Sequence, residues 1–307
     1  MRQVLDLKAA SREEWLLQRK KGIGGSDIGA IFSLSPFKSP LALWVDKTSP
    51  EIEPEDEDNI PMAVGRELEP FLAARFQRKF KKEYGLDIEV KEMDYMLQHD
   101  TVDYFLVTID RWFKHPEWDN VGIELKTTSA YQKNAWEDEE IPESYYLQCQ
   151  WALFITGWRL WYIGCLIGNS KFIIKPIPRN EEVIKVLEER AHDYWQNYVL
   201  KNVAPAPIGT ERDDDIIDAM YPEADTGRHI EFNGDEQASI EKMIKEYDTL
   251  SKDIKASTLS LDTIKQKVKM LMGTAEWTRV SGRKIIYQNL VKHVPAYTSK
   301  YRLFRIF

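Results

Sequence analysis

Apolar side chains recur every three or four residues along much of the chain, which is the spacing that lines one face of a helix. The clearest case covers residues 62–83, where four large apolar residues fall on one stripe. The same pattern predicts further helices in the remaining sequence. The stripe consists of Leu68, Leu72, Phe76 and Phe80. The other helices are expected over 12–20, 41–47, 142–156, 180–201, 235–255 and 262–272.

Runs of alternating or continuous apolar residues predict the strands. Residues 104–110 and 121–126 are two such runs, and the segment 114–120 between them is rich in turn formers. We therefore expect the two runs to pair as a hairpin. Additional strands are predicted over 158–167, 171–177, 277–280, 284–288 and 302–307.

The organisation of the chain changes near residue 205, where a segment rich in proline and alanine precedes a run of acidic residues. We expect a core over residues 1–205, an acidic linker over 206–232 and a C-terminal extension over 233–307. In the extension, the last two predicted helices are expected to form an αα-hairpin, followed by a small cluster of strands.

Composition narrows the class of protein. With 307 residues, of which 43% are hydrophobic, the chain can form one large domain or a large and a small one. No apolar run reaches the ~20 residues that a membrane span requires, and the N-terminus lacks a signal-peptide pattern. Cys149 and Cys165 lie inside apolar segments, so we expect buried free thiols in a reducing cytoplasm.

The net charge of −8 is unevenly distributed. Residues 51–60 carry six acids and no base, and residues 211–225 carry seven acids and one arginine. In contrast, residues 252–307 hold twelve lysines and arginines against three acids. A positive region on an acidic protein can still bind phosphates locally, and a solvated basic face explains the same pattern equally well.

The predicted hairpin carries the most informative residues. Asp110 ends its first strand, and Glu124 and Lys126 share one face of the second because side chains alternate along a strand. Two carboxylates and an ammonium group at one sheet edge suit binding of a divalent cation and cleavage of a phosphodiester. A surface hairpin with a simple ion pair is the alternative that these residues leave open.

Two further positions have less specific patterns. Glu69 falls on the inward face of the helix over 62–83, where a carboxylate needs a partner: a metal ion, a buried salt bridge, or a rotation of the helix that exposes it. Gln148, on the helix over 142–156, is either a polar residue at a helix end or a side chain that holds a lysine or a water molecule.

A glycine-rich turn near the N-terminus suits a phosphate group. The turn covers Gly22 to Asp27, and Ser26 near its end is the predicted N-cap of the next helix. It follows the basic residues Arg19, Lys20 and Lys21. Backbone N–H groups that point outward from such a turn carry partial positive charge, and the basic side chains add charge-assisted hydrogen bonds. Most turns of this kind, however, serve only as turns.

Taken in order, these motifs resemble the YqaJ-type viral recombinases, relatives of the phage lambda exonuclease within the PD-(D/E)XK nuclease superfamily. The resemblance covers about residues 10–200. It implies an α/β (α+β) fold of the restriction-endonuclease type, with a small mixed sheet flanked by helices. The motifs are Arg19 and Gly22–Asp27, then Gly65-Arg66-Glu67-Leu68-Glu69-Pro70, Asp110, Glu124-Leu125-Lys126 and Gln148-Cys149-Gln150.

The resemblance also implies roles for particular residues. Metal ligands are expected at Glu69, Asp110, Glu124 and the backbone carbonyl of Leu125, which would bind two Mg²⁺ ions, with Mn²⁺ as a substitute. The catalytic set comprises Asp110, Glu124, Lys126 and Gln148, and the DNA 5′-phosphate is expected at Arg19 and Ser26. Two positions depart from the family pattern, because Ile109 and Arg111 flank Asp110 where many members have proline or a small residue, and glycine.

The function that the resemblance implies is 5′→3′ digestion of one strand of linear duplex DNA, which leaves 3′ single-stranded overhangs for phage-type recombination. The implied partners are duplex DNA ends, a single-strand annealing protein of the RecT or Beta type, and further copies of the chain in a trimeric ring, in the cytoplasm of a bacterial host. Two alternatives remain: a metal-dependent endonuclease on the same core, and a catalytically silent DNA-binding or scaffold protein. The C-terminal extension could guide duplex DNA, recruit a partner or join subunits.

Overall fold

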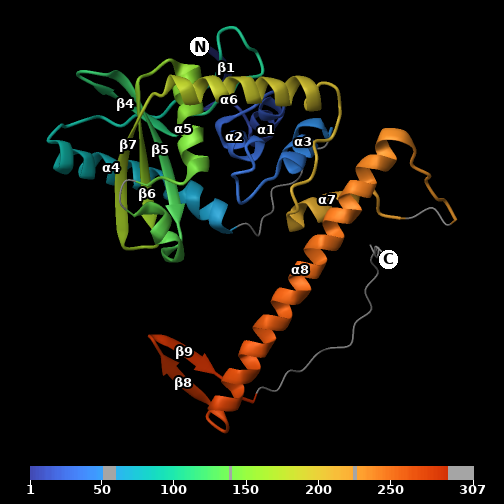
Figure 1. Cartoon of the computed structure of the whole chain (residues 1–307). Helices are drawn as coiled ribbons and strands as arrows, with labels where there is room; N and C mark the ends of the chain where they lie inside the picture. Colours follow the sequence, from blue (N-terminus) through green and yellow to red (C-terminus); the bar gives the residue numbers. More distant parts are fainter. Residues whose placement is uncertain (51–59, 138–139, 224–226, 290–307) are drawn as a thin grey trace. The chain divides into compact units, whose positions relative to one another are not determined.

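The computed structural model describes residues 1–50, 60–137, 140–223 and 227–289. The chain divides into two compact units, Met1–Ala219 and Met220–Phe307. The first unit contains two sheets and the helices around them, and the second contains one long helix and a small hairpin (Figure 1).

A four-stranded mixed sheet forms the centre of the first unit. Its strands lie in the order β4-β5-β6-β7, in which β5 and β6 are parallel and both outer pairs are antiparallel. A parallel pair needs a crossover connection, and helix α5 supplies it between β5 and β6. The elements are β4 (Arg111–His115), β5 (Asp119–Thr128), the 3-10 helix η1 (Ala130–Trp136), α5 (Glu143–Thr156), β6 (Leu160–Ile167) and β7 (Lys171–Pro178).

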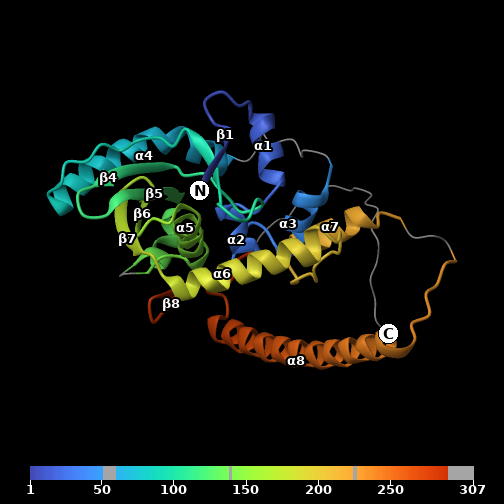
Figure 2. The same ribbon diagram turned by 90° about the horizontal axis from the view of Figure 1, so that it is seen from above.

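Helices cover both faces of this sheet, with α4 on one side and α5 on the other (Figure 2). On the first face, Phe76 and Phe80 of α4 pack against Phe113 and Tyr162. On the opposite face, Trp161 belongs to the core that α5 completes. Neighbouring residues of β6 therefore point into different cores, as the alternation of a strand requires. The small mixed sheet flanked by helices confirms the predicted fold class.

The remaining helices of the first unit follow their sequence signals closely. Ser11 accepts a hydrogen bond from the N–H of Glu14, whose carboxylate accepts one from the Ser11 N–H, so the capping box is formed. Ser39 caps α3, and its hydroxyl accepts a hydrogen bond from the Ala42 N–H at 3.0 Å. The helices are α1 (Arg12–Lys20), α2 (Gly25–Ile31), α3 (Pro40–Thr48), α4 (Ile60–Tyr84), α6 (Glu181–Tyr194), which continues as a π-helical turn (Trp195–Val199), and α7 (Glu211–Met220).

The predicted pairing of residues 104–110 with 121–126 is wrong. Leu106 and Val107 form β3, the third strand of a separate antiparallel sheet in the order β1-β2-β3, with β1 at Arg2–Asp6 and β2 at Tyr95–Gln98. The hairpin partner of β5 is instead β4, which begins at Arg111. The chain thus passes from one sheet to the other immediately before Arg111, because the apolar run before it is buried in a different core.

Part of the predicted acidic linker over 206–232 is a helix that contacts the buried Ser39 of the first unit. Its residues 211–220 form α7, and Asp213 is only 1% exposed. The carboxylate of Asp213 accepts hydrogen bonds from the Ser39 hydroxyl and, at 2.9 Å, from the Ile208 N–H. An acid predicted to be solvated therefore anchors α7 to the start of α3.

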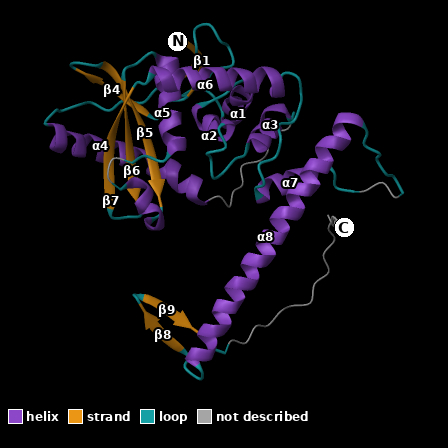
Figure 3. Ribbon diagram, viewed as in Figure 1, coloured by secondary structure: helices purple, strands orange, loops and turns teal. Residues whose placement is uncertain are grey.

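The second unit contains one helix where the sequence predicts two. Helix α8 runs without a break from Gly234 to Met272, so the αα-hairpin is wrong (Figure 3). The segment between the predicted helices contains serine and threonine but neither glycine nor proline. Ser260 donates to the Ala256 carbonyl at 3.0 Å, which satisfies its hydroxyl within the helix. The hairpin of β8 (Trp277–Val280) and β9 (Arg283–Ile286) follows, and the strand predicted over 302–307 lies outside the described residues.

Two expectations from composition can be compared with the described residues. Cys149 and Cys165 are buried free thiols, as predicted, and burial raises the pKa of Cys165 to about 12. None of the described helices combines the length and the apolarity that crossing a bilayer demands.

The close approach of β5 and β6 at Gly122 gives a stability prediction. A Cβ atom at Gly122 would lie 2.2 Å from the Trp161 ring, so Gly122→Ala forces a large buried side chain to move. We expect a loss of about 1–3 kcal/mol in the free energy of unfolding, measured by urea denaturation. Gly65→Ala is the control, because its nearest neighbour lies at 4.0 Å, and alanine in helix α4 should raise stability by up to about 1 kcal/mol. Equal stability of the two variants would contradict the packing described.

Candidate active site

Asp110, Glu124 and Lys126 meet at the edge of the central sheet where β4 begins. Arg111 pairs with Ile123, so Asp110 comes directly before the last pair of the β4–β5 ladder. Its carboxylate Oδ2 accepts a hydrogen bond from the Leu125 N–H at 2.8 Å. On the neighbouring stretch of β5, Lys126 Nζ lies 2.6 Å from Glu124 Oε1. The structure therefore brings together the three residues that the sequence predicts at one edge.

The environment of the two carboxylates favours their protonated forms. Glu124 is buried, and its burial together with the nearby charge of Asp110 raises the pKa of Glu124 to about 7. Burial also raises the pKa of Asp110, against the opposing charge of Lys126. Burial disfavours the ammonium group of Lys126, but Glu124 and Asp110 outweigh it and hold the pKa of Lys126 above its usual range. Two crowded carboxylates of this kind are stabilised by any added cation.

Helix α5 contributes the other side of the site. Gln148 Nε2 donates to Glu124 Oε1 at 2.7 Å, so Gln148 holds a carboxylate rather than the lysine or water molecule that the sequence suggests. The ring of Tyr145 lies beneath the ammonium of Lys126, 5.0 Å from its centroid. Sequence reasoning gave Tyr145 no functional role, although its position three residues before Gln148 on the same helix places both on one face.

Glu69 lies next to this group but is engaged with another side chain. Its Oε1 forms an ion pair with Arg111, whose guanidinium also donates to the Asp110 carbonyl at 2.6 Å and lies 3.3 Å from Glu92. Burial and the charge of Asp110 raise the pKa of Glu69. A salt bridge, one of the alternatives for Glu69, is thus realised, although only Arg111 is buried and Glu69 is partly exposed. Arg111 is the residue that departs from the family pattern.

Several oxygen atoms of the site could bind a divalent cation. Among the described residues, no three Asp, Glu, His or Cys side chains are grouped closely enough to hold a metal ion as they stand. However, Asp110 Oδ1 and Glu124 Oε2 accept no hydrogen bond from the described residues. The Leu125 carbonyl faces the same edge as its N–H, since both groups of a strand residue point the same way. These hard oxygen donors fit Mg²⁺ or Mn²⁺, provided that Glu69 exchanges Arg111 for the ion.

The candidate phosphate-binding residues are also neighbours. Arg19 donates to the Ser26 hydroxyl at 2.9 Å, and its guanidinium lies 4.7 Å from the centroid of the Trp15 ring. The prediction that Ser26 is the N-cap of α2 is wrong. Gly24 takes that position, and Asp27 accepts a hydrogen bond from its N–H at 2.9 Å, which leaves the Ser26 hydroxyl to Arg19.

The two groups of residues lie side by side because α2 packs closely against α5. A Cβ atom at Gly25 would lie 3.1 Å from Cγ of Gln148, so this glycine permits the contact. The N-terminal end of α2, which carries Ser26, therefore lies against α5 beside Gln148, and Gln148 in turn contacts Glu124. A group bound at Arg19 and Ser26 would be adjacent to the acidic sheet edge.

Comparison with known proteins identifies the family of the chain. The sequence model of the YqaJ-like viral recombinase domain matches residues 14–159, an interval that contains every candidate site residue named above. The protein YqaJ of Bacillus subtilis (strain 168), itself uncharacterised, is 30% identical over 285 residues, which cover 92% of this chain and 85% of YqaJ. The chain belongs to the YqaJ-like viral recombinase family.

Solved structures resemble the chain less closely. An alkaline exonuclease from Laribacter hongkongensis aligns with a TM-score of 0.49 and 16% identity, over 68% of this chain and 100% of that one. A phage-related exonuclease from Haemophilus somnus 129PT aligns with a TM-score of 0.41 and 12% identity, over 59% of this chain and 95% of that one.

Proposed function

We propose that the chain is a metal-dependent exodeoxyribonuclease that digests one strand of linear duplex DNA in the 5′→3′ direction. The observation that carries this proposal is the meeting of Asp110, Glu124 and Lys126 at one sheet edge, within a member of a viral recombinase family. The products would be 3′ single-stranded overhangs for phage-type single-strand-annealing recombination. A single-strand annealing protein would receive them, and further copies of the chain would complete a ring, as the resemblance implies.

In this proposal, Glu69, Asp110, Glu124 and the Leu125 carbonyl would hold two Mg²⁺ ions, with Mn²⁺ as a substitute. When bound, the ions would lower the pKa of water and offset negative charge on the phosphate. Lys126 donates from its ammonium group and is placed to stabilise the charge that develops on the phosphate. Gln148 fixes the orientation of Glu124 by its hydrogen bond, and Tyr145 confines Lys126.

Arg19 and Ser26 would bind the 5′-phosphate of the DNA end. Their hydrogen bond keeps a guanidinium and a hydroxyl together, and both groups suit phosphate oxygens. Attack would then be confined to ends, because a phosphate monoester is present only there. The buried free thiols Cys149 and Cys165 support a reducing cytoplasm as the place of action.

The test compares ends with circles. In Mg²⁺ or Mn²⁺ we expect rapid digestion of a linear duplex with 5′-phosphates and none of a covalently closed circle of the same sequence. Release of 5′-labelled nucleotide before 3′-labelled nucleotide reports the direction. Ca²⁺ and chelator serve as controls, since both should stop the reaction. Rapid linearisation of the circle would instead establish the endonuclease alternative, and no cleavage of any substrate would support the silent scaffold.

The end-recognition residues allow a sharper comparison. Arg19→Ala should lower the preference for 5′-phosphate over 5′-hydroxyl ends by about tenfold, which corresponds to a lost charge-assisted hydrogen bond of about 1.5 kcal/mol. Lys21→Ala is the matched control, because Lys21 is an exposed neighbour whose ammonium contacts Gln18 alone among the described residues. An unchanged preference in Arg19→Ala would refute the 5′-phosphate site while leaving the nuclease centre untouched.

A further inference from the structure

Helix α8 carries an apolar seam that repeats every seven residues. One set of positions comprises Ile240, Tyr247, Ile254, Leu261 and Val268, and the set three residues further along comprises Met243, Leu250, Ser257, Ile264 and Leu271. Nine of these ten residues are therefore apolar, with Ser257 as the exception. An ideal helix drifts away from a strict seven-residue repeat, so a repeat sustained this long is typical of a helix that supercoils around another helix.

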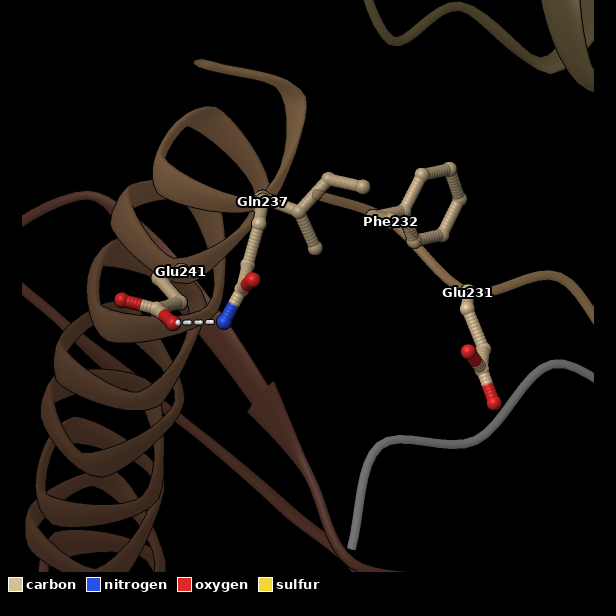
Figure 4. Close-up of a pocket in the computed structure, with 5 residues that line it drawn as sticks. Glu231, Phe232, Gln237 and Glu241 are labelled. Carbon is tan, nitrogen blue, oxygen red and sulfur yellow. Dashed lines mark hydrogen bonds between the residues drawn. The ribbon is translucent and has the colours of Figure 1, made fainter. Parts of the chain in front are cut away.

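The described part of the chain leaves most of this seam exposed. No residue of α8 is buried. Ile240 and Val268 of the seam are partly buried, and its other large apolar residues are exposed, from 46% at Tyr247 to 88% at Leu271. Ile240, at the N-terminal end of the seam, lines a shallow pocket with Glu231 and Phe232 (Figure 4). A Gln237–Glu241 hydrogen bond of 2.9 Å borders that pocket. An apolar stripe about 45 Å long, left in water, marks an interaction surface.

The charges of α8 indicate which helix fits. Residues 234–254 contain six acids and three lysines, whereas residues 255–272 contain four lysines and one acid. A second copy of α8 in antiparallel orientation would place each acidic half against a basic half and would also oppose the two helix dipoles. A parallel copy would place like charges together.

The flanking positions give the same answer residue by residue. When the seam 240–271 is aligned antiparallel with itself, Glu246 of one copy lies opposite Lys267 of the other, at both ends of the pair. In a parallel alignment, Glu246 would instead meet Ser251 and would find no cation. Residues 290–307 of the same chain are little more than half as long as the seam and do not match its length.

We propose that α8 is a self-association element, which pairs with α8 of a second copy of this chain as an antiparallel two-stranded coiled coil. The pairing is independent of the nuclease chemistry and would link two chains, or two rings of chains, through their C-terminal units. It would hold two exonuclease units in one assembly, which suits processing of the two ends of a DNA break.

The first experiment measures the mass of the full chain by sedimentation velocity. Ile254→Glu places a charge in the middle of the seam and should halve the mass of the assembly, whether the linked bodies are single chains or rings. Leu259→Glu is the matched control, because Leu259 is 70% exposed against 66% for Ile254 but lies off the seam. Equal masses for wild type and Ile254→Glu would overturn the proposal.

The second experiment tests the orientation. Glu246→Lys and Lys267→Glu should each weaken association, and the double variant should restore it, because the charges then pair with reversed sign. The two residues lie about 31 Å apart within one helix, so this rescue requires two copies. Glu241→Lys and Lys269→Glu are controls off the seam. Failure of the rescue, or a carbodiimide cross-link from Glu246 to any helix other than a second α8, would overturn the antiparallel pairing.

Discussion

Replacement of Lys126 by methionine is expected to lower the rate of DNA cleavage by about 10²–10³-fold, with little change in the DNA concentration that gives half-maximal rate. Methionine has no ammonium group, so the substitution removes the positive charge of Lys126. Methionine keeps an unbranched side chain of similar length and loses the contact of the ammonium with the Tyr145 ring, so most of the loss should fall on the reaction rather than on folding. The rate is measured on a 5′-phosphorylated duplex in saturating Mg²⁺.

Two controls make this result specific. Lys171→Met changes a lysine at the exposed start of β7 and should retain full activity. Asp110→Asn should be as inactive as Lys126→Met, because it removes a proposed metal ligand, and thermal unfolding should show both variants folded. If Lys126→Met kept more than a tenth of the wild-type rate, the Glu124–Lys126 contact would be a structural ion pair, as the alternative from the sequence holds.

The contacts of the site show what sequence can supply and what it cannot. Glu124 and Lys126 lie two residues apart on one strand, so the face that they share follows from the alternation of side chains. The approach of Asp110 to the same edge was predicted for a wrong reason. The apolar run before Asp110 indeed forms a strand, but apolarity does not specify which strand it joins, and β3 joins the other sheet.

Long-range partners are the least accessible to sequence reasoning. The inward position of Glu69 and the unusual Arg111 were both visible in the sequence, yet nothing local joins two residues 42 positions apart. Their ion pair depends on how α4 crosses the sheet. Local contacts need no such long-range information: the caps at Ser11 and Ser39 are each satisfied within one turn of their own helix.

Some local signals are degenerate, and these account for the remaining differences. Ser26 follows glycines and precedes an apolar run, which predicts an N-cap, but Gly24 with Asp27 three residues later satisfies the same helix end. The sequence pattern divides this region into two predicted helices, over 235–255 and 262–272, whereas the serine and threonine hydroxyls between them can bond within one continuous helix. In each case two arrangements satisfy the same backbone groups.

The buried ion pair behind the phosphate-binding residues should dominate the stability of the first unit. The side chains of Asp27 and Lys47 are each 1% exposed and meet at 2.7 Å. Lys47 also donates to the Arg19 carbonyl at 2.9 Å, so the pair holds the segment that presents Arg19. Asp27→Asn would leave a buried ammonium without its carboxylate and should cost about 3–5 kcal/mol in the free energy of unfolding, measured in urea.

An exposed pair provides the comparison. Lys81 and Asp87 lie 2.6 Å apart with side chains 59% and 66% exposed, so Asp87→Asn should cost at most about 1 kcal/mol. The double variant Asp27→Asn/Lys47→Met should be more stable than Asp27→Asn alone, because no charge is then left buried. Similar losses for Asp27→Asn and Asp87→Asn would contradict the ion pair's importance.

The pH dependence of the free energy of unfolding tests the charge of Asp27 independently. Burial opposes ionisation of Asp27, but the charges of Lys47 and Arg19 outweigh it and hold the pKa of Asp27 below its usual value of 3.8. A carboxyl whose pKa is lower in the folded state binds its proton more readily in the unfolded chain. Its contribution to stability is therefore complete well above pH 3.8 and decreases as the pH falls below that value.

The stability difference between wild type and Asp27→Asn should accordingly be constant from pH 8 to about pH 5 and shrink in more acidic solution. A difference that grew with acidity would mean that Asp27 is protonated in the folded protein and that the segment carrying Arg19 is held by other contacts.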